Sequence, residues 1–233
     1  MAEKCYLFRE NVLTIISLVS STDKVVWLIH AKGKLLGKRS TPQLIGTLSA
    51  SNIKWKNLGY RSINAAWDID ANKTQPAIMN VTIKHALNKN QILQNARLIL
   101  SGTLSQHKLL FIGNTPNSDW SMDIAGKNTD DLWTGSLNSW NITDHVEHEQ
   151  WSLSKPVPLS YDKTGLKIDP LQLLGKNSDL EFSANLQDLQ NSQIHLQAKS
   201  WPLHSFQPWA PPMIKMAGHV TGQSDITIKH GIL

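Results

Sequence analysis

Apolar and polar residues alternate along most of the chain. The alternation is clear in residues 44–50, 81–84, 120–125, 133–137, 151–153, 180–184, 194–198 and 226–228. A period of two gives a strand one apolar face and one polar face. The segments between these runs, such as 113–117 and 175–178, are rich in Gly, Asn, Ser and Pro, which favour turns. Capped helical patterns are hard to find, so the sequence predicts an all-β, mostly antiparallel protein with few or no helices.

A sheet with one apolar face must cover that face. Either a second sheet closes it as a sandwich, or an elongated sheet curves so that its apolar face lines a groove, as in a β-taco-like fold. We expect the curved groove and keep the closed sandwich as the alternative. The residues expected to form one continuous apolar face along the groove are Leu48, Ile83, Leu98, Leu100, Leu109, Met122, Ile124, Leu137, Leu153, Phe182, Leu196, Met216 and Ile228.

Such a groove fits an acyl chain, which needs continuous apolar area and no directional polar contacts. Burial of each methylene group contributes about 0.8 kcal/mol. Four of the nine tryptophans, Trp133, Trp140, Trp151 and Trp201, have two interpretations. They are either core residues or residues at the groove rim, where an indole suits the boundary between an apolar groove and polar headgroups.

The charge balance is mildly basic. Lys and Arg number 23 against 18 Asp and Glu, for a formal charge of +5 and a pI near 9.3. We interpret the excess as spread along the chain, with no basic run interleaved with aromatic residues. This pattern favours contact with an anionic surface such as lipid headgroups over binding of nucleic acid.

Residues 144–149, with the sequence DHVEHE, could be read as a metal-binding string. His145 and His148 would share a metal only if they lay on a helix, and no helical pattern surrounds them. A solvated turn between two strands explains these residues better, and a structural role at a strand start explains His107. The sequence lacks GxSxG, P-loop and GxGxxG motifs. We therefore expect no catalytic residues, no metal and no cofactor.

The N-terminal segment, residues 1–24, stays unassigned, and residues 25–233 are expected to form one repeating β-groove module. The apolar run 12–19 is too short to span a bilayer and makes a weak export signal. Cys5 is the only cysteine, so an intramolecular disulfide is excluded.

Several segments, taken in order, resemble the TamB translocation and assembly module family. The central match is residues 133–137 (WTGSL) followed by 151–153 (WSL), Pro156 and Leu159. Upstream, residues 100–109 (LSGTLSQHKL) are similar to a strand pair of that family. Downstream, residues 201–203 (WPL) with Pro208 and Pro211, then 218–222 (GHVTG), are similar to another segment. The resemblance covers roughly residues 41–230.

This resemblance implies a periplasmic segment of an envelope protein that is anchored in the inner membrane of Gram-negative bacteria. AsmA-like and bridge-type lipid transfer proteins of this kind shield phospholipid acyl chains in an apolar β-groove. They work with an Omp85-type, TamA-like outer-membrane partner in phospholipid transport and outer-membrane protein assembly. Because the chain is short for the family, we expect an internal fragment of a larger protein.

Two other functions stay open at this point. One is a non-catalytic scaffold or chaperone that binds partner β-strands by edge augmentation. The other is a closed β-sandwich binding module of the lectin-like kind, for which paired tryptophans and Asn/Asp loops would be the cue.

Overall fold

The structure, a computed structural model, describes residues 11–16, 28–55, 58–72, 74–87, 93–129, 131–187, 191–205 and 213–229. The described residues divide between two compact units, Met1–Gly113 (the first unit) and Asn114–Leu233 (the second unit). That residues 25–233 form one repeating β-groove module stays a prediction. Each unit is described by itself.

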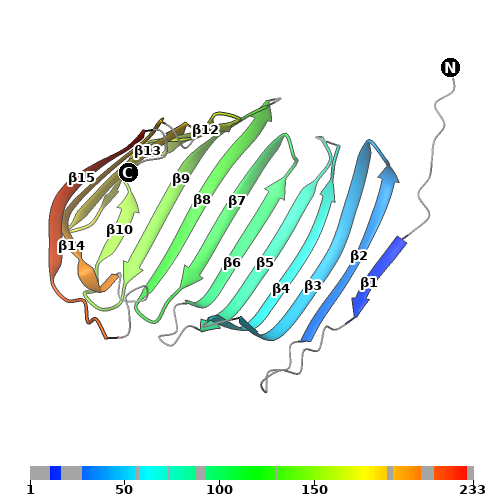
Figure 1. The fold of residues 1–233 in the computed structure, drawn as a ribbon, viewed down its shortest axis with the longest axis horizontal. Helices are drawn as coiled ribbons and strands as arrows, with labels where there is room; N and C mark the ends of the chain where they lie inside the picture. The colour runs from blue at the N-terminus through cyan, green and yellow to red at the C-terminus, as the bar shows by residue number, and fades with distance from the viewer. Residues whose placement is uncertain are drawn as a thin grey trace. The chain divides into compact units, whose positions relative to one another are not determined.

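The first unit is a sheet whose strands follow one another in chain order (Figure 1). Its strands are β1 (Asn11–Ile16), β2 (Leu28–Lys38), β3 (Thr41–Trp55), β4 (Leu58–Asp70), β5 (Ala77–Leu87), β6 (Leu93–Gly102) and β7 (Gln106–Asn114). The pairs from β1–β2 to β5–β6 are antiparallel, and their registers do not shift through the described residues, although the pairing of β3 to β6 is interrupted at one position in each strand. Alternation in the sequence therefore becomes a strict division between two faces.

The second unit is also an antiparallel sheet, and its strands β14 and β15 are visibly curved (Figure 1). Its strands are β8 (Ser118–Thr129), β9 (Leu132–Asp144), β10 (Gln150–Leu153), β11 (Val157–Asp162), β12 (Gly165–Leu174), β13 (Asp179–Gln187), β14 (Asn191–Pro202) and β15 (His219–Lys229). Both β10 and β11 lie between β9 and β12, each pairing with a different part of them.

Among the residues that the structure describes, bulges interrupt the second sheet at three places. The register shifts between Asp123 and Ile124, between Ile168 and Leu171, and between Ala198 and Trp201. A bulge bends its strand and increases the local twist. Pro170 and Ser200, which has φ of 50°, lie within two of these bulges. The bends let this sheet curl towards its own apolar face.

The prediction of an all-β, antiparallel protein with few helices is confirmed. In the described part of the chain, helix is limited to a single 3₁₀ turn at residues 203–205. None of the described residues forms a helix that could cross a membrane.

The charges divide between the two units. Residues 1–113 contain 15 Lys and Arg against 5 Asp and Glu, whereas residues 114–233 contain 8 against 13. The interpretation that the basic excess is spread along the chain is therefore wrong. The first unit is strongly basic and the second is acidic.

Candidate functional site

The first unit presents an apolar face that crosses five strands. The registers place one residue of each strand directly opposite the next in a row made of Ala31, Leu48, Ala65, Val81 and Leu98. Four interstrand spacings make this row about 19 Å wide. Because directly opposed residues share a face, the whole row lies on one side of the sheet.

The neighbouring rows on this side are apolar as well. One contains Ile29, Ala50, Ile63, Ile83 and Ala96; the next contains Gly33, Gly46, Trp67, Met79 and Leu100; the last contains Leu35, Leu44, Ile69 and Ala77. Among the described side chains of this face, the buried apolar residues are Ala50, Ala77 and Ala96, while Leu35 and Leu44 are 41% and 45% exposed. Most of its large side chains are half-buried. We call these rows the apolar face of the first unit.

The opposite face of the same strands is polar. Directly opposed residues there include Lys32, Thr47, Ala66 and Asn80. Arg97 lies on this side too, and its Nε donates to Asn80 Oδ1 at 3.2 Å. One side of the sheet therefore suits an apolar ligand and the other suits water.

The apolar face of the second unit is covered by its own side chains. A buried cluster joins residues of β9, β10, β11, β12 and β14, namely Leu137, Trp151, Val157, Leu171, Leu173 and Trp201. The ring centroids of Trp151 and Trp201 are 4.7 Å apart, although β12 and β13 lie between their strands. Three interstrand spacings would separate those strands by ~14 Å in a flat sheet. The sheet therefore curls around this cluster.

The residues expected in the groove fall into both units. Leu48, Ile83, Leu98 and Leu100 lie on the apolar face of the first unit, and Leu109 is half-buried in β7. Those that belong to or pack against the buried cluster of the second unit are Met122, Ile124, Leu137, Leu153 and Phe182.

Three expected groove residues lie outside that cluster. Leu196 pairs with Phe182 and Ile228 pairs with Ser192, so both strands bring them to the apolar side of the second sheet, where Leu196 is 40% exposed. Met216 lies in the segment between β14 and β15, outside the described strands.

The rim assignment needs correction for two tryptophans. Trp151 and Trp201 are only 1% and 5% exposed. The Trp151 indole donates from Nε1 to Ser178 Oγ at 2.6 Å, and Ser178 is itself buried. These two are core residues because the curled sheet brings them together. Trp133 and Trp140 are half-buried, and Trp140 packs against the cluster.

Residues 144–149 form the turn between β9 and β10. The residues from His145 to His148 are exposed, as expected for a solvated turn, whereas Asp144 and Glu149 are buried. Glu149 Oε1 accepts from the backbone N–H of Asn177 at 2.8 Å. Asp144 Oδ2 accepts from the backbone N–H of Glu147 at 2.7 Å. Both buried carboxylates hold turns in place.

Two histidines from outside this turn contact its carboxylates. His204 Nε2 is 2.9 Å from Asp144 Oδ1, and its Nδ1 is 3.4 Å from Glu147 Oε1. His219 Nε2 is 3.0 Å from Glu147 Oε2. These contacts hold the turn against the segment after β14 and against the first residue of β15. The described residues contain no group of three or more His, Cys, Asp or Glu arranged to hold a metal ion.

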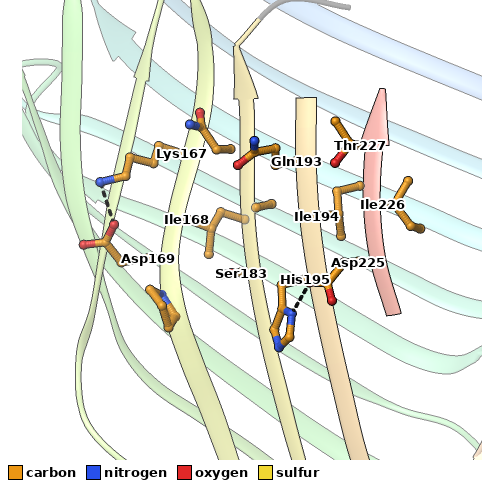
Figure 2. A pocket seen from close by; sticks show the side chains of 13 residues that line it. Lys167, Ile168, Asp169, Ser183, Gln193, Ile194, His195, Asp225, Ile226 and Thr227 are labelled. Atoms are coloured by element: carbon orange, nitrogen blue, oxygen red, sulfur yellow. Dashed lines mark hydrogen bonds and ion pairs between the residues drawn. The ribbon is translucent and has the colours of Figure 1, made fainter. Parts of the chain in front are cut away.

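A pocket of about 400 Å³ lies over β12 to β15 of the second unit (Figure 2). Ser183, His195 and Asp225 occupy one cross-strand row there. His195 Nδ1 lies 2.6 Å from Asp225 Oδ1, and this hydrogen bond lowers the pKa of Asp225.

These three residue types also make up hydrolase triads, in which the imidazole must contact the nucleophilic hydroxyl. Within the described residues, no hydrogen bond joins Ser183 to His195. The His195–Asp225 pair therefore stands as a contact between strands, and the absence of catalysis stays a prediction.

Sequence reasoning missed three features of these sites. The first is the division of charge between the two units, which the sequence could have revealed, because it needs only the net charge of each half of the chain. The burial of Asp144 and Glu149 gave no signal, because each has a partner far along the chain, His204 and Asn177 respectively. The Ser183–His195–Asp225 row requires the strand registers, which turn lengths alone do not fix.

The comparisons with known proteins agree with the resemblance seen in the sequence. No solved structure matches the chain. The family model described as "TamB, N-terminal domain" matches residues 17–231, which is nearly the whole chain. The chain therefore belongs to the TamB family.

Proposed function

We propose that this chain shelters phospholipid acyl chains on its apolar β-sheet face, as a non-catalytic part of lipid transport across the bacterial envelope. In this proposal the protein works in the periplasm, attached to the inner membrane, and supplies lipid to the outer membrane. An Omp85-type outer-membrane protein is its proposed partner, and outer-membrane protein assembly depends on the same supply.

One observation carries the proposal, namely the apolar face of the first unit. Its rows extend without a polar residue from Ala50 to Leu44 along β3 and across five strands. Large side chains remain half-buried there, unlike those of the second unit's cluster. Extended apolar area of this kind is a binding surface or an aggregation hazard, and acyl chains would cover it without needing polar partners.

Photo-crosslinking in cells tests the proposal. A benzophenone amino acid replaces Leu48 or Leu98 on the apolar face, and the matched controls replace Thr47 or Arg97, the preceding residues on the polar face. Irradiation should attach phospholipid at positions 48 and 98 and not at positions 47 and 97, as judged by mass spectrometry. Equal labelling of both faces, or none at either, would contradict the proposal.

A charge on the face gives a second readout. Leu48→Asp should reduce lipid capture by a benzophenone at position 98, because a carboxylate on an apolar surface resists desolvation. Thr47→Asp is its control. Ile124 and Phe182 are less suitable positions, because they pack against the buried cluster and their substitution would disturb folding.

Edge augmentation is a second candidate, favoured by β15. This strand ends the strand order of the second unit and pairs with β14, and its residues 219–227 are exposed. An exposed strand edge can pair with a strand of a partner. Crosslinks from β15 to protein rather than lipid would support this alternative.

A further inference from the structure

The apolar face of the first unit ends in a row of polar residues. The registers that flank Asn52, Arg61, His85 and Gln94 place these four directly opposite one another on β3, β4, β5 and β6. Each lies two residues along its strand from a member of the adjacent apolar row, and so on the same side of the sheet. The members of that row are Ala50, Ile63, Ile83 and Ala96. We call these four residues the polar end row.

The backbone is irregular at this row. Asn52 and His85 have φ of 54° and 47°, in the left-handed region that side-chain-bearing residues rarely adopt. The strand pairing skips the four residues and resumes in the same register on each side. Two departures of this kind, on the strands that flank β4, are unfavourable, and such departures cluster at ligand-binding sites.

Arg61 gives this row a positive charge that is exposed to solvent. Within the described residues, no carboxylate pairs with it. The described acidic residues of the first unit are Asp68 and Asp70, and both lie at the other end of β4, on the polar face. A guanidinium presents a planar fork of N–H donors that matches phosphate oxygens. The row also offers the amide group of Asn52, which is exposed.

The dimensions fit a lipid placed along the strands. From Asn52 to Leu44 on β3 the distance is ~27 Å at about 3.4 Å per residue. The hydrocarbon depth of one leaflet is about 15 Å, half of a bilayer core. An acyl chain that starts near the polar end row would therefore stay on apolar rows for its whole length.

We propose that the polar end row binds the phosphate of a phospholipid whose acyl chains lie along the apolar face, with Arg61 as the main contact. This inference rests on the proposed function and adds the headgroup chemistry and the direction of the lipid. The occupant is a lipid phosphate, since the row lies at the end of a surface that only an apolar chain would cover.

Binding of pyrene-labelled lipids to the full chain tests this. The probes are a pyrene-labelled phosphatidylglycerol and a pyrene-labelled diacylglycerol with the same acyl chains and no phosphate. The wild-type chain should bind the phospholipid about tenfold more tightly, the scale of one charge-assisted hydrogen-bond pair. Arg61→Gln should remove this preference while leaving diacylglycerol binding unchanged, and Arg61→Lys should restore part of it.

Lys84→Gln is the matched control, because Lys84 precedes His85 on β5 and lies on the polar face. It should retain the preference. If Arg61→Gln kept the preference for the phospholipid, or if the wild type bound the two lipids equally, the inference would be overturned and the proposed function would stand. If the wild type bound neither lipid, both this inference and the proposed function would be wrong. Displacement of the phospholipid by millimolar inorganic phosphate would reassign the row to free phosphate.

Discussion

The indole of Trp133 lies against two glycines of neighbouring strands. A Cβ atom on Gly126 would come within 2.3 Å of the Trp133 ring, and one on Gly135 within 2.5 Å. Contacts this short do not occur between real atoms, so the rigid ring would have to move. The two glycines oppose each other on β8 and β9, and they create the space that the indole fills.

Gly126→Ala should therefore destabilise the protein. Overpacking of this kind typically lowers the free energy of unfolding by about 1–3 kcal/mol. Urea denaturation monitored by tryptophan fluorescence measures the change. Gly222→Ala is the control, since a Cβ there would meet nothing within 4 Å, and it should change stability by less than about 0.5 kcal/mol. A neutral Gly126→Ala would contradict this, because it would mean that the Trp133 ring shifts to admit the methyl group at little cost.

At this scale, alternation predicted which side chains share a face, and no more. It placed Leu48, Ile83, Leu98 and Leu100 correctly on one side of the first sheet. It could not separate a core tryptophan from a rim tryptophan. That difference depends on how far the second sheet curls, which three bulges decide.

Among the elements, the hairpin between β11 and β12 shows how a turn is fixed. Asp162 Oδ1 accepts hydrogen bonds from Thr164 Oγ1 at 2.6 Å, from Thr164 N at 2.7 Å and from Gly165 N at 3.2 Å. These bonds favour the charged carboxylate, and the Thr164 hydroxyl contributes most to lowering the pKa of Asp162.

Thr164→Ala should raise the pKa of Asp162 towards its ordinary value, as followed by NMR titration of its carboxyl carbon. A lowered carboxyl pKa stabilises the fold above the unfolded value, and the stabilisation is lost as pH falls through the folded pKa. The stability difference between wild type and Thr164→Ala should therefore be present above about pH 4 and vanish in acid. Thr164→Ser keeps the hydroxyl and should behave as wild type. An unchanged pKa in Thr164→Ala would assign the effect to the backbone donors.

Strands were the part of the fold that the sequence predicted best. Period-two patterns found most of them, because each strand of an amphipathic sheet repeats the same signal. The turn at residues 144–149 was predicted only in part. The polar residues at its centre predict that the centre is exposed. The burial of Asp144 depends instead on His204, sixty residues further along the chain.

At the scale of the whole molecule, the two units differ in charge and in how they cover their apolar faces. The first unit is basic, and the buried apolar residues among the described side chains of its face are alanines. The second is acidic and buries tryptophans, leucines and a valine in one cluster. The net charge of each half was readable from the sequence, but the boundary between the units was not, because alternation continues across it.

Hydrogen exchange of the full chain should reveal this difference. Amides exchange slowly where opening a strand would expose many buried apolar contacts. Without lipid, the amides of β9 and β12, whose residues Leu137, Leu171 and Leu173 are buried, should exchange more slowly than those of β3 to β5. Mass spectrometry of peptides from each strand measures the rates.

Adding vesicles of phosphatidylglycerol should then slow exchange in β3 to β6 and leave β12 nearly unchanged. A bound acyl chain would cover the half-buried residues of the first unit, and a ligand that binds only the folded form suppresses opening by mass action. The cluster around Trp151 is already covered by its own sheet, so lipid has no further apolar area to bury there. Leu48→Asp should abolish the slowing in β3 to β6, whereas Thr47→Asp on the polar face should preserve it. Equal slowing of β12 and β3 would instead mean that both units take up lipid, and the second cluster would then have to open to admit it.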